Sequence, residues 1–219
     1  MKPEVDYHLE RVSYADIAPL LEAHHPYKAG KPQLGTYVFG VLEKGRTIAG
    51  YLWAPPPYGA AKSVRPDAPF GVLALSRMVA VPKAERSLNH VSRPLRYQMK
   101  HLIDRTRWPS LVTWHDEGEG HTGHVYKCSG WTKTRSSRSP KLRDASGARV
   151  SGYCNGRHVQ PPPSVVRTRS TLWRWEHHAV PSEVNAEQWM LEQGWERRPI
   201  PGKTWRSGKP AHRVTRRTV

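Results

Sequence analysis

The segment that decides the fold is Val72-Leu73-Ala74-Leu75-Ser76-Arg77-Met78-Val79-Ala80-Val81, which is almost wholly apolar. A run of this composition between turn signals predicts a strand that is covered on both faces. Ser76 and Arg77 interrupt it, and polar side chains in such a strand must be hydrogen-bonded or take part in function. Strand alternation places these two side chains on opposite faces, so that one faces a cleft and the other the outer surface.

The segments on either side of this strand predict an α+β fold with one mixed sheet flanked by helices. Upstream we expect a strand, a helix, a hairpin and a Pro-rich loop, at residues 5–12, 14–23, 35–42 with 47–53, and 54–70. Downstream we expect a helix, a short strand and a short helix at residues 87–106, 111–114 and 123–129. This order of elements is also that of the acetyltransferase (GNAT) fold.

The last third of the chain predicts fewer regular elements. We expect loops at residues 136–139 and 161–163 and a strand at 167–176 in which Arg and Trp alternate. A helix at 182–193 is capped by Ser182 and stopped by Gly194. The domain organisation that follows is a core at 1–131, a basic Trp-rich extension at 132–208 packed on the core, and a disordered basic tail at 209–219.

Positive charge dominates the composition. Lys and Arg total 35 against 18 Asp and Glu, a formal net charge of +17. Such an excess destabilises the fold by self-repulsion unless a polyanion shares the field, and nucleic acid is the commonest polyanionic partner. The excess is concentrated at residues 131–219, which also hold six of the nine Trp. Basic side chains interleaved with flat rings suit phosphates and unstacked bases.

Other global features argue against secreted and membrane proteins. There are only two cysteines, Cys128 and Cys154, which is too few for a disulfide scaffold and lacks zinc-knuckle spacing. No apolar run approaches membrane-spanning length, and the start of the chain lacks the apolar core of a signal peptide. We therefore expect a cytoplasmic protein with no membrane association, as a monomer or a homodimer.

Three segments of the chain carry distinctive motifs. They are His24-His25-Pro26-Tyr27-Lys28, then Leu75-Ser76-Arg77-Met78 with Pro82-Lys83 and Ser92-Arg93, and then Trp114-His115-Asp116-Glu117-Gly118-Glu119-Gly120-His121-Thr122-Gly123-His124-Val125-Tyr126-Lys127. The third is the most specific, because an aspartate ends a strand and is followed by a Gly-His-x-Gly-x-hydrophobic-Tyr run and then Trp131. Together these segments resemble the phage Mom family of adenine-modifying enzymes.

The resemblance implies a GNAT-like fold that acts on double-stranded DNA. In the family, a carbamoylmethyl group is added to N6 of adenine, which protects phage DNA from host restriction. The target atom lies inside the base stack, so the adenine must be flipped out. Two alternatives remain, namely a GNAT acyltransferase with a small-molecule or protein acceptor and a non-catalytic DNA-binding protein.

The loop after the long strand departs from an ordinary acetyltransferase. An acetyltransferase holds a pyrophosphate on a Gly-rich loop and the following helix N-terminus, whereas residues 81–90 contain no glycine. Bulky side chains keep a backbone from approaching a pyrophosphate closely, so a CoA-type donor is doubtful and the donor remains unknown. The resemblance implies donor contacts from Asn89, Ser92 and Arg93.

The candidate catalytic residues are Asp116, Tyr126, Arg77 and Ser76. A carboxylate at a strand end beside flexible glycines can accept a proton from the adenine amino group or bind a metal. The resemblance to acetyltransferases assigns Tyr126 as a general acid or as a group that orients the donor. Arg77 suits a phosphate, of DNA or of the donor.

A metal site is a further hypothesis. Imidazole, phenolate and carboxylate groups together suit Fe(II) or a similar ion, and the fold brings the segment before the hairpin towards the strand that carries Asp116. We expect the ligands His25, Tyr27 and Asp116, with His121 and His124 as competing ligands.

The candidate DNA contacts lie in two places. Tyr58, in the Pro-rich loop, can stack on a flipped base. Arg135, Arg138, Lys141 and Arg143 form a run of cations suited to backbone phosphates.

Overall fold

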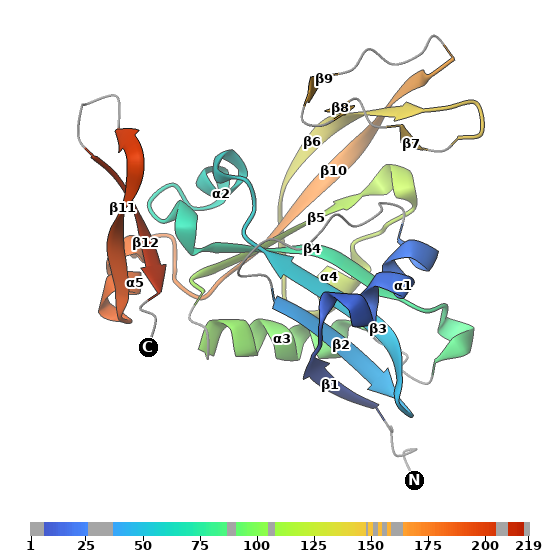
Figure 1. Ribbon diagram of the computed structural model, residues 1–219, viewed down its shortest axis with the longest axis horizontal. Helices are drawn as coiled ribbons and strands as arrows, with labels where there is room; N and C mark the ends of the chain where they lie inside the picture. The colour runs from blue at the N-terminus through green and yellow to red at the C-terminus, as the bar shows by residue number, and fades with distance from the viewer. Residues whose placement is uncertain are drawn as a thin grey trace.

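The described part of the computed structural model is built on one large sheet (Figure 1). It comprises residues 7–25, 37–86, 91–104, 108–147, 149–150, 153–154, 157–158, 164–204 and 210–216. The sheet has eight strands in the order β1-β2-β3-β4-β5-β10-β6-β7. Its strands are β1 Tyr7–Arg11, β2 Tyr37–Glu43, β3 Arg46–Ala54, β4 Val72–Ala80, β5 Ser110–Asp116, β6 Thr132–Arg143, β7 Arg149–Val150 and β10 Val166–His178.

Helices cover both faces of this sheet. On one face, α1 (Tyr14–His24) packs Ile17 and Leu21 against Val38, Leu52 and Val79. On the same face, α2 (Tyr58–Val64) packs on the first part of β4 and β5. The other face is covered by α3 (Ser92–Asp104), whose apolar side chains join the main core, and by the short helix α4 (His124–Cys128). Successive residues of each strand face opposite sides of the sheet, so a separate core forms on each side.

The central parallel strands separate soon after they start. β4 and β5 pair only at Val72↔Ser110, Leu73↔Leu111 and Ala74↔Val112. Just beyond this point a side chain bridges the two strands, because the Thr113 hydroxyl donates to the Leu75 carbonyl at 3.1 Å. The sheet is therefore open between the carboxyl ends of its two central parallel strands.

Several predictions for the N-terminal part are confirmed, and one is wrong. The first helix, the hairpin and the long strand lie where the patterns predicted them. The predicted loop at residues 54–70 instead contains α2, which begins directly after Pro57. A proline before the first turn removes no helical hydrogen bond, and Ala61 and Val64 provide a buried face. The 3₁₀ turn Pro69–Gly71 then leads into β4.

In the C-terminal part, the strand predicted at 167–176 is confirmed as β10, but the predicted loop at 136–139 is wrong. Residues 136–139 belong to β6, whose first half lies at the sheet edge and is exposed on both faces. Polar residues and Pro140 are tolerated there because an edge strand needs neither an apolar face nor every ladder hydrogen bond. The loop predicted at 161–163 lies outside the described residues.

The last helix begins later than predicted. α5 spans Ala186–Glu192 and is capped by Asn185, whose side-chain oxygen accepts from the Gln188 amide at 2.9 Å, so Ser182 is not the cap. Gly194 stops it, as predicted, in the left-handed conformation.

The expected domain boundary at Trp131 does not coincide with a structural boundary. β10 lies between β5 and β6 in the sheet, so residues 132–178 are part of the core and not an extension beside it. Residues 210–216, expected in a disordered tail, form β12, which pairs with β11 (Trp195–Thr204). A second small sheet pairs β8 (Tyr153–Cys154) with β9 (Arg157–His158).

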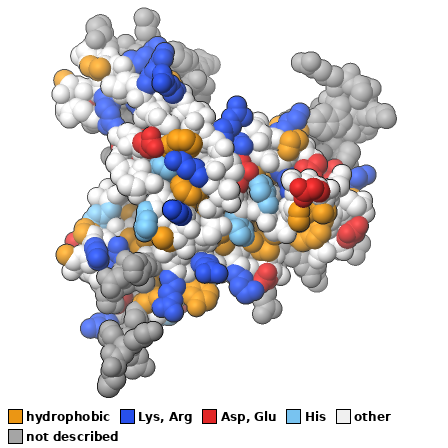
Figure 2. Space-filling view, turned by 180° about the vertical axis from the view of Figure 1, so that it is seen from behind, with side chains coloured by type: hydrophobic (Ala, Val, Ile, Leu, Met, Phe, Trp, Pro, Cys, Tyr) orange, Lys and Arg blue, Asp and Glu red, His pale blue; other side chains and the backbone are white. Residues whose placement is uncertain are grey.

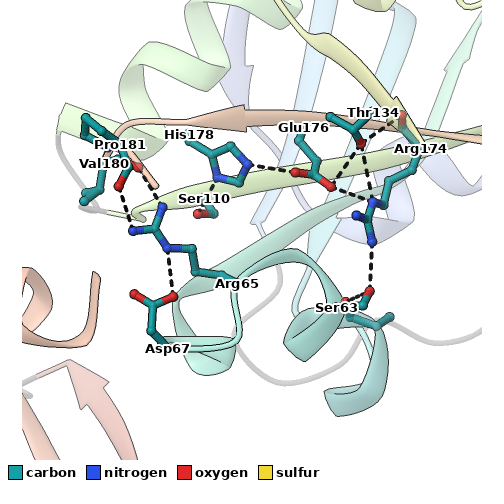
Figure 3. A network of polar contacts seen from close by, with 11 residues as sticks. Ser63, Arg65, Asp67, Ser110, Thr134, Arg174, Glu176, His178, Val180 and Pro181 are labelled. Atoms are coloured by element: carbon teal, nitrogen blue, oxygen red, sulfur yellow. Dashed lines mark hydrogen bonds and ion pairs between the residues drawn. The ribbon is translucent and has the colours of Figure 1, made fainter. Parts of the chain in front are cut away.

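A buried arginine holds the segment after β10 to the sheet (Figure 3). Arg65, at the end of α2, donates to the carbonyls of Val180, Pro181 and Val184 at 2.7, 2.9 and 2.6 Å. Its Nε also donates to Asp67 at 3.0 Å. These three charge-assisted hydrogen bonds to backbone carbonyls fix the path of the chain from β10 into α5.

A second cluster of polar side chains lies between β5, β6 and β10 (Figure 3). The Glu176 carboxylate contacts the His178 ring at 2.8 Å and accepts from the Thr134 hydroxyl at 3.0 Å. His178 in turn contacts the Ser110 hydroxyl at 2.9 Å, and Arg174 pairs with Glu176. Burial is the largest single influence on the pKa of Glu176 and raises it. The contacts with His178 and Arg174 together lower it by more, so the pKa of Glu176 lies below its ordinary value. These bonds join β10 to both of its neighbours.

Within the part of the chain that the structure describes, the helices are too short or too polar to cross a membrane.

Replacement of Arg65 should destabilise the fold strongly. Arg65→Met leaves the buried Val180 carbonyl, two partly buried carbonyls and one Asp67 oxygen without this donor, so we expect the free energy of unfolding to fall by about 3–5 kcal/mol. Urea unfolding followed by circular dichroism measures it. Lys62→Met, on the exposed side of the same helix, is the matched control and should change stability by no more than about 0.5 kcal/mol. Equal effects of the two substitutions would contradict the role given to Arg65.

Candidate functional site

A pocket of about 930 Å³ occupies the opening between β4 and β5. Its walls come from the ends of both strands, the Pro-rich segment before α2, the loop from Gly120 to Gly123, the start of α4, and β6 and β10. Strand ends and loops that meet around a hollow are a common setting for binding and catalytic groups. This pocket is the candidate functional site.

Asp116 is held in the wall of this pocket by two bonds. It ends β5 and is only 3% exposed. Its Oδ1 accepts from the Gly118 amide at 3.0 Å, and its Oδ2 forms an ion pair with the equally buried Lys141 of β6. A buried carboxylate is costly unless it is paired and hydrogen-bonded. Lys141 is therefore the counter-ion of the candidate catalytic carboxylate.

His115 is a pocket residue that the sequence analysis missed. Its Nδ1 accepts a hydrogen bond of 2.7 Å from the Trp175 indole N–H, so the neutral ring carries its proton on Nε2. Burial, more than the neighbouring Lys133 ammonium, lowers the pKa of His115. In the described part of the chain, His115 Nε2 has no hydrogen-bond partner. The neutral ring can thus donate a hydrogen bond from Nε2 to a bound ligand.

Tyr126 packs directly on His115. The two rings are stacked at 6.4 Å, and Trp175 and Trp131 contact Tyr126 at 5.8 and 6.2 Å between ring centroids. Burial raises the pKa of the Tyr126 phenol, which keeps it protonated at neutral pH. Tyr126 lines the pocket, so the predicted pair Asp116 and Tyr126 does lie in one site.

Ser76 and Arg77 also line the pocket, but not in the way that strand alternation predicted. The pairing of β3 with β4 shifts register between Leu52 and Trp53, whose partners are Arg77 and Leu75. Ser76 is therefore the extra residue of a β-bulge, and a bulge breaks the strict alternation of side chains. The Arg77 guanidinium donates to the Ser76 carbonyl at 2.7 Å. The bulge lets both residues reach the same pocket.

Two of the three residues predicted to contact the donor, Ser92 and Arg93, do not lie in the pocket wall. Ser92 and Arg93 begin α3 and are absent from the lining, and Asn89 lies outside the described residues. In the loop before α3, residues 83–85 form a 3₁₀ turn, and the Arg86 side chain donates to the Val81 carbonyl at 3.0 Å. The described part of this loop thus bonds to itself.

The metal hypothesis finds no complete ligand set among the described residues. His25 and Asp116 both line the pocket, as do His121 and His124, but no three His, Cys, Asp or Glu side chains of the described chain cluster as metal ligands do. Both Asp116 oxygens already have partners. Tyr27 lies outside the described residues, so the set with Tyr27 stays a prediction.

The predicted DNA-contacting residues divide into two groups. Tyr58 is 42% exposed at the start of α2, and Arg135 and Arg138 are exposed on β6. Lys141 is buried against Asp116, and Arg143 pairs with Glu119 at 2.7 Å. The run of four cations is therefore not one exposed surface. Strand alternation turns Arg138 to the face opposite the other three, and on that other face Lys141 and Arg143 are already engaged in ion pairs.

The strand order and the opening between two central parallel strands define a GNAT-like α+β fold, which confirms the predicted fold class. Within this class, residues 6–155 match the model of the Mom protein family. The match covers more than half of the chain, so the protein belongs to the Mom family. Among curated proteins, none matches the chain.

Solved acetyltransferases are similar in fold at low sequence identity. A Bacillus subtilis acetyltransferase in complex with CoA has 8% identity and a TM-score of 0.49, over 81% of this chain and 100% of its own. A Drosophila melanogaster polyamine N-acetyltransferase has 13% identity and a TM-score of 0.48, over 79% and 100%. A Staphylococcus aureus N-acetyltransferase has 12% identity and a TM-score of 0.47, over 78% and 98%. These similarities do not extend to a substrate.

Two glycines of the pocket loop provide a matched test of its packing. Gly120 and Gly123 both have positive φ, so alanine is strained at either position. A Cβ on Gly120 meets open space, whereas one on Gly123 would lie 2.6 Å from the Trp175 ring and 2.7 Å from the His115 ring. We expect Gly120→Ala to cost about 1–2 kcal/mol and Gly123→Ala to cost clearly more and to alter the near-ultraviolet circular dichroism of the aromatic cluster. Indistinguishable variants would refute this close packing.

The lowered pKa of His115 predicts a pH-dependent stability. Below the ordinary value of 6.5, the unfolded chain binds a proton at this imidazole while the folded protein does not, so stability falls as pH decreases from 6.5 towards the folded pKa. In His115→Asn, an amide oxygen can replace Nδ1 and nothing titrates. Urea unfolding at several pH values between 7.5 and 5 should show a steeper loss for wild type than for the variant. Parallel curves would contradict the lowered pKa.

Proposed function

We propose that this protein is a Mom-like transferase that adds a carbamoylmethyl group to N6 of adenine in double-stranded DNA and so protects the DNA from restriction. The observation that carries the proposal is the fixed Asp116 carboxylate in the wall of a pocket at the opening of the sheet. Membership of the Mom family supports the substrate and the group transferred.

The chemistry requires a proton acceptor near the reacting nitrogen. The exocyclic amino group of adenine is a weak nucleophile because its lone pair is delocalised into the ring, and it must lose a proton as the new bond forms. A carboxylate that is paired with Lys141 and oriented by the Gly118 amide has a fixed position from which it can accept this proton. Asp116 is therefore assigned as the general base, and Lys141 as the residue that positions it.

The transfer is a substitution at the methylene carbon of the incoming group. The bond from N6 to this carbon forms, the bond from this carbon to the leaving group of an activated donor breaks, and the leaving group departs with the electron pair. The N6 proton passes to Asp116. His115 Nε2–H is the hydrogen-bond donor available to an oxygen atom of the donor molecule, and the protonated Tyr126 phenol, which is bonded to Thr113, packs beside the His115 ring.

Removal of the Asp116 charge should abolish modification, whereas removal of the charge of a neighbouring carboxylate should not. The assay is expression with a plasmid, digestion of the DNA to nucleosides and mass spectrometry for a new adenosine derivative. We expect Asp116→Asn to lower its yield by at least about 100-fold, the usual contribution of a general base. The control is Glu119→Gln, which also loses an ion pair with β6 but lies outside the pocket lining.

Loss of the Asp116 charge leaves Lys141 buried and unpaired by it, which can lower stability. The double variant Asp116→Asn with Lys141→Met removes both charges and should fold but remain inactive. Modification by this double variant would refute the role of Asp116. If wild type yields ordinary nucleosides alone, while the purified protein binds CoA tightly, an acyltransferase with another acceptor replaces the proposed function.

A further inference from the structure

The outer ends of β6 and β10, with the short β7 paired to β6, form an arm that extends past the end of β5 (Figure 1). The last residue of β5, Asp116, pairs with Leu172, so the two long strands of the arm comprise residues 138–143 of β6 and 166–171 of β10. These two segments contain no acidic residue, and their five cations are Arg138, Lys141, Arg143, Arg167 and Arg169.

The two faces of the arm use these cations differently. Lys141 and Arg143 pair with Thr168 and Val166 on one face, and there they form the ion pairs with Asp116 and Glu119. This face also contributes Ser139 and Lys141 to the pocket wall. Its positive charge is therefore neutralised within the protein.

The opposite face of the arm carries Arg138, Arg167 and Arg169. The register Arg138↔Thr171, Pro140↔Arg169 and Leu142↔Arg167 places all three on this face. All three are exposed, and within the described chain no carboxylate lies within ion-pair distance of them. Figure 2 shows Lys and Arg side chains gathered on this projecting part of the molecule, at the upper left.

This arrangement favours an extended polyanion over an isolated anion. Residues two apart on a strand are about 6.6 Å apart, and diagonal neighbours across two strands are about 7–8 Å apart. Three like charges so close destabilise the fold unless an external anion shares the field. A nucleic-acid strand presents a phosphate about every 3.4 Å of helix axis, so a row of arginines at this spacing can contact several phosphates at once.

We propose that the face formed by Arg138, Arg167 and Arg169 holds the sugar-phosphate backbone of double-stranded DNA during modification. This inference rests on the proposed function for the identity of the polyanion. The same two strands continue into the pocket wall through Ser139, Lys141 and Leu172, so DNA held on the arm lies beside the pocket. The two faces of β6 thus have different roles. Arg138 contacts phosphate on one face, and Lys141 pairs with the catalytic carboxylate on the other.

The salt dependence of binding tests this surface. Wild type and the triple variant Arg138→Ala, Arg167→Ala, Arg169→Ala are titrated into a fluorescent DNA duplex at several sodium chloride concentrations. Each phosphate contact contributes about 0.9 to the slope of log K against log salt concentration, so the triple variant should have a slope smaller by up to about 2.7. Replacement of the same three residues by Lys keeps the charges and should restore most of the slope.

The matched control removes three exposed cations from the other end of the molecule, with Lys83→Ala, Arg96→Ala and Lys100→Ala on the 3₁₀ turn and α3 (Figure 1). It loses the same net charge but should keep the wild-type slope. Thermal unfolding of all variants identifies any loss of folding. In the nucleoside assay with purified protein and a bacterial extract that supplies the donor, the arm variant should raise KM for DNA and leave kcat nearly unchanged, because it lacks no pocket residue.

The outcomes separate this inference from the proposed function. If wild type binds and modifies DNA while the arm variant keeps both slope and KM, the arm surface is refuted and the proposed function stands. If wild type does not bind DNA at any salt concentration, both fail. A third outcome is that poly-glutamate binds wild type but not the arm variant, while both bind DNA equally. The arm then binds an acidic protein, and this inference is overturned.

Discussion

The separation of β4 from β5 is the constraint on which the rest of the site depends. Parallel strands that pair at three positions and then diverge leave backbone and side-chain groups facing a gap instead of each other. The protein accommodates the gap with a bulge at Ser76 on one side and with β10 and β6 on the other. His115, Asp116 and Ser76 therefore lie where the pairing of β4 with β5 has stopped, and Tyr126 reaches the same pocket from α4. The orientation of His115 and Asp116 depends on side-chain bonds.

Those side-chain bonds form two sets on the two faces of β5. On the side of α2, Asp116 is fixed by Lys141 and by the Gly118 amide. On the side of α4, His115 is fixed by Trp175 and by the close approach of Gly123. One set provides a charged proton acceptor and the other a neutral hydrogen-bond donor. Adjacent residues of a single strand thus present two different chemistries to one pocket.

The sequence was most informative where a pattern is local. The apolar run at 72–81, the hairpin and the Asp-Gly-His-Gly-Tyr segment predicted the central strands and Asp116. Lys141 was misassigned because its neighbours Arg135 and Arg138 are surface cations, and only the register of β6 with β10 turns it towards Asp116. His115 was missed because its one distinguishing partner, Trp175, is distant in sequence. A histidine beside an aspartate at a strand end was the available signal.

The position of β10 has a consequence for how the protein is made. This strand is the last of the large sheet in chain order, yet it lies between β5 and β6. During synthesis β6 cannot settle beside its final neighbour until residues 166–178 have left the ribosome. The contacts that close the sheet join segments far apart in the chain, and such non-local pairing slows folding. A nascent chain therefore carries an unfinished sheet edge, open to wrong partners, until β10 has emerged.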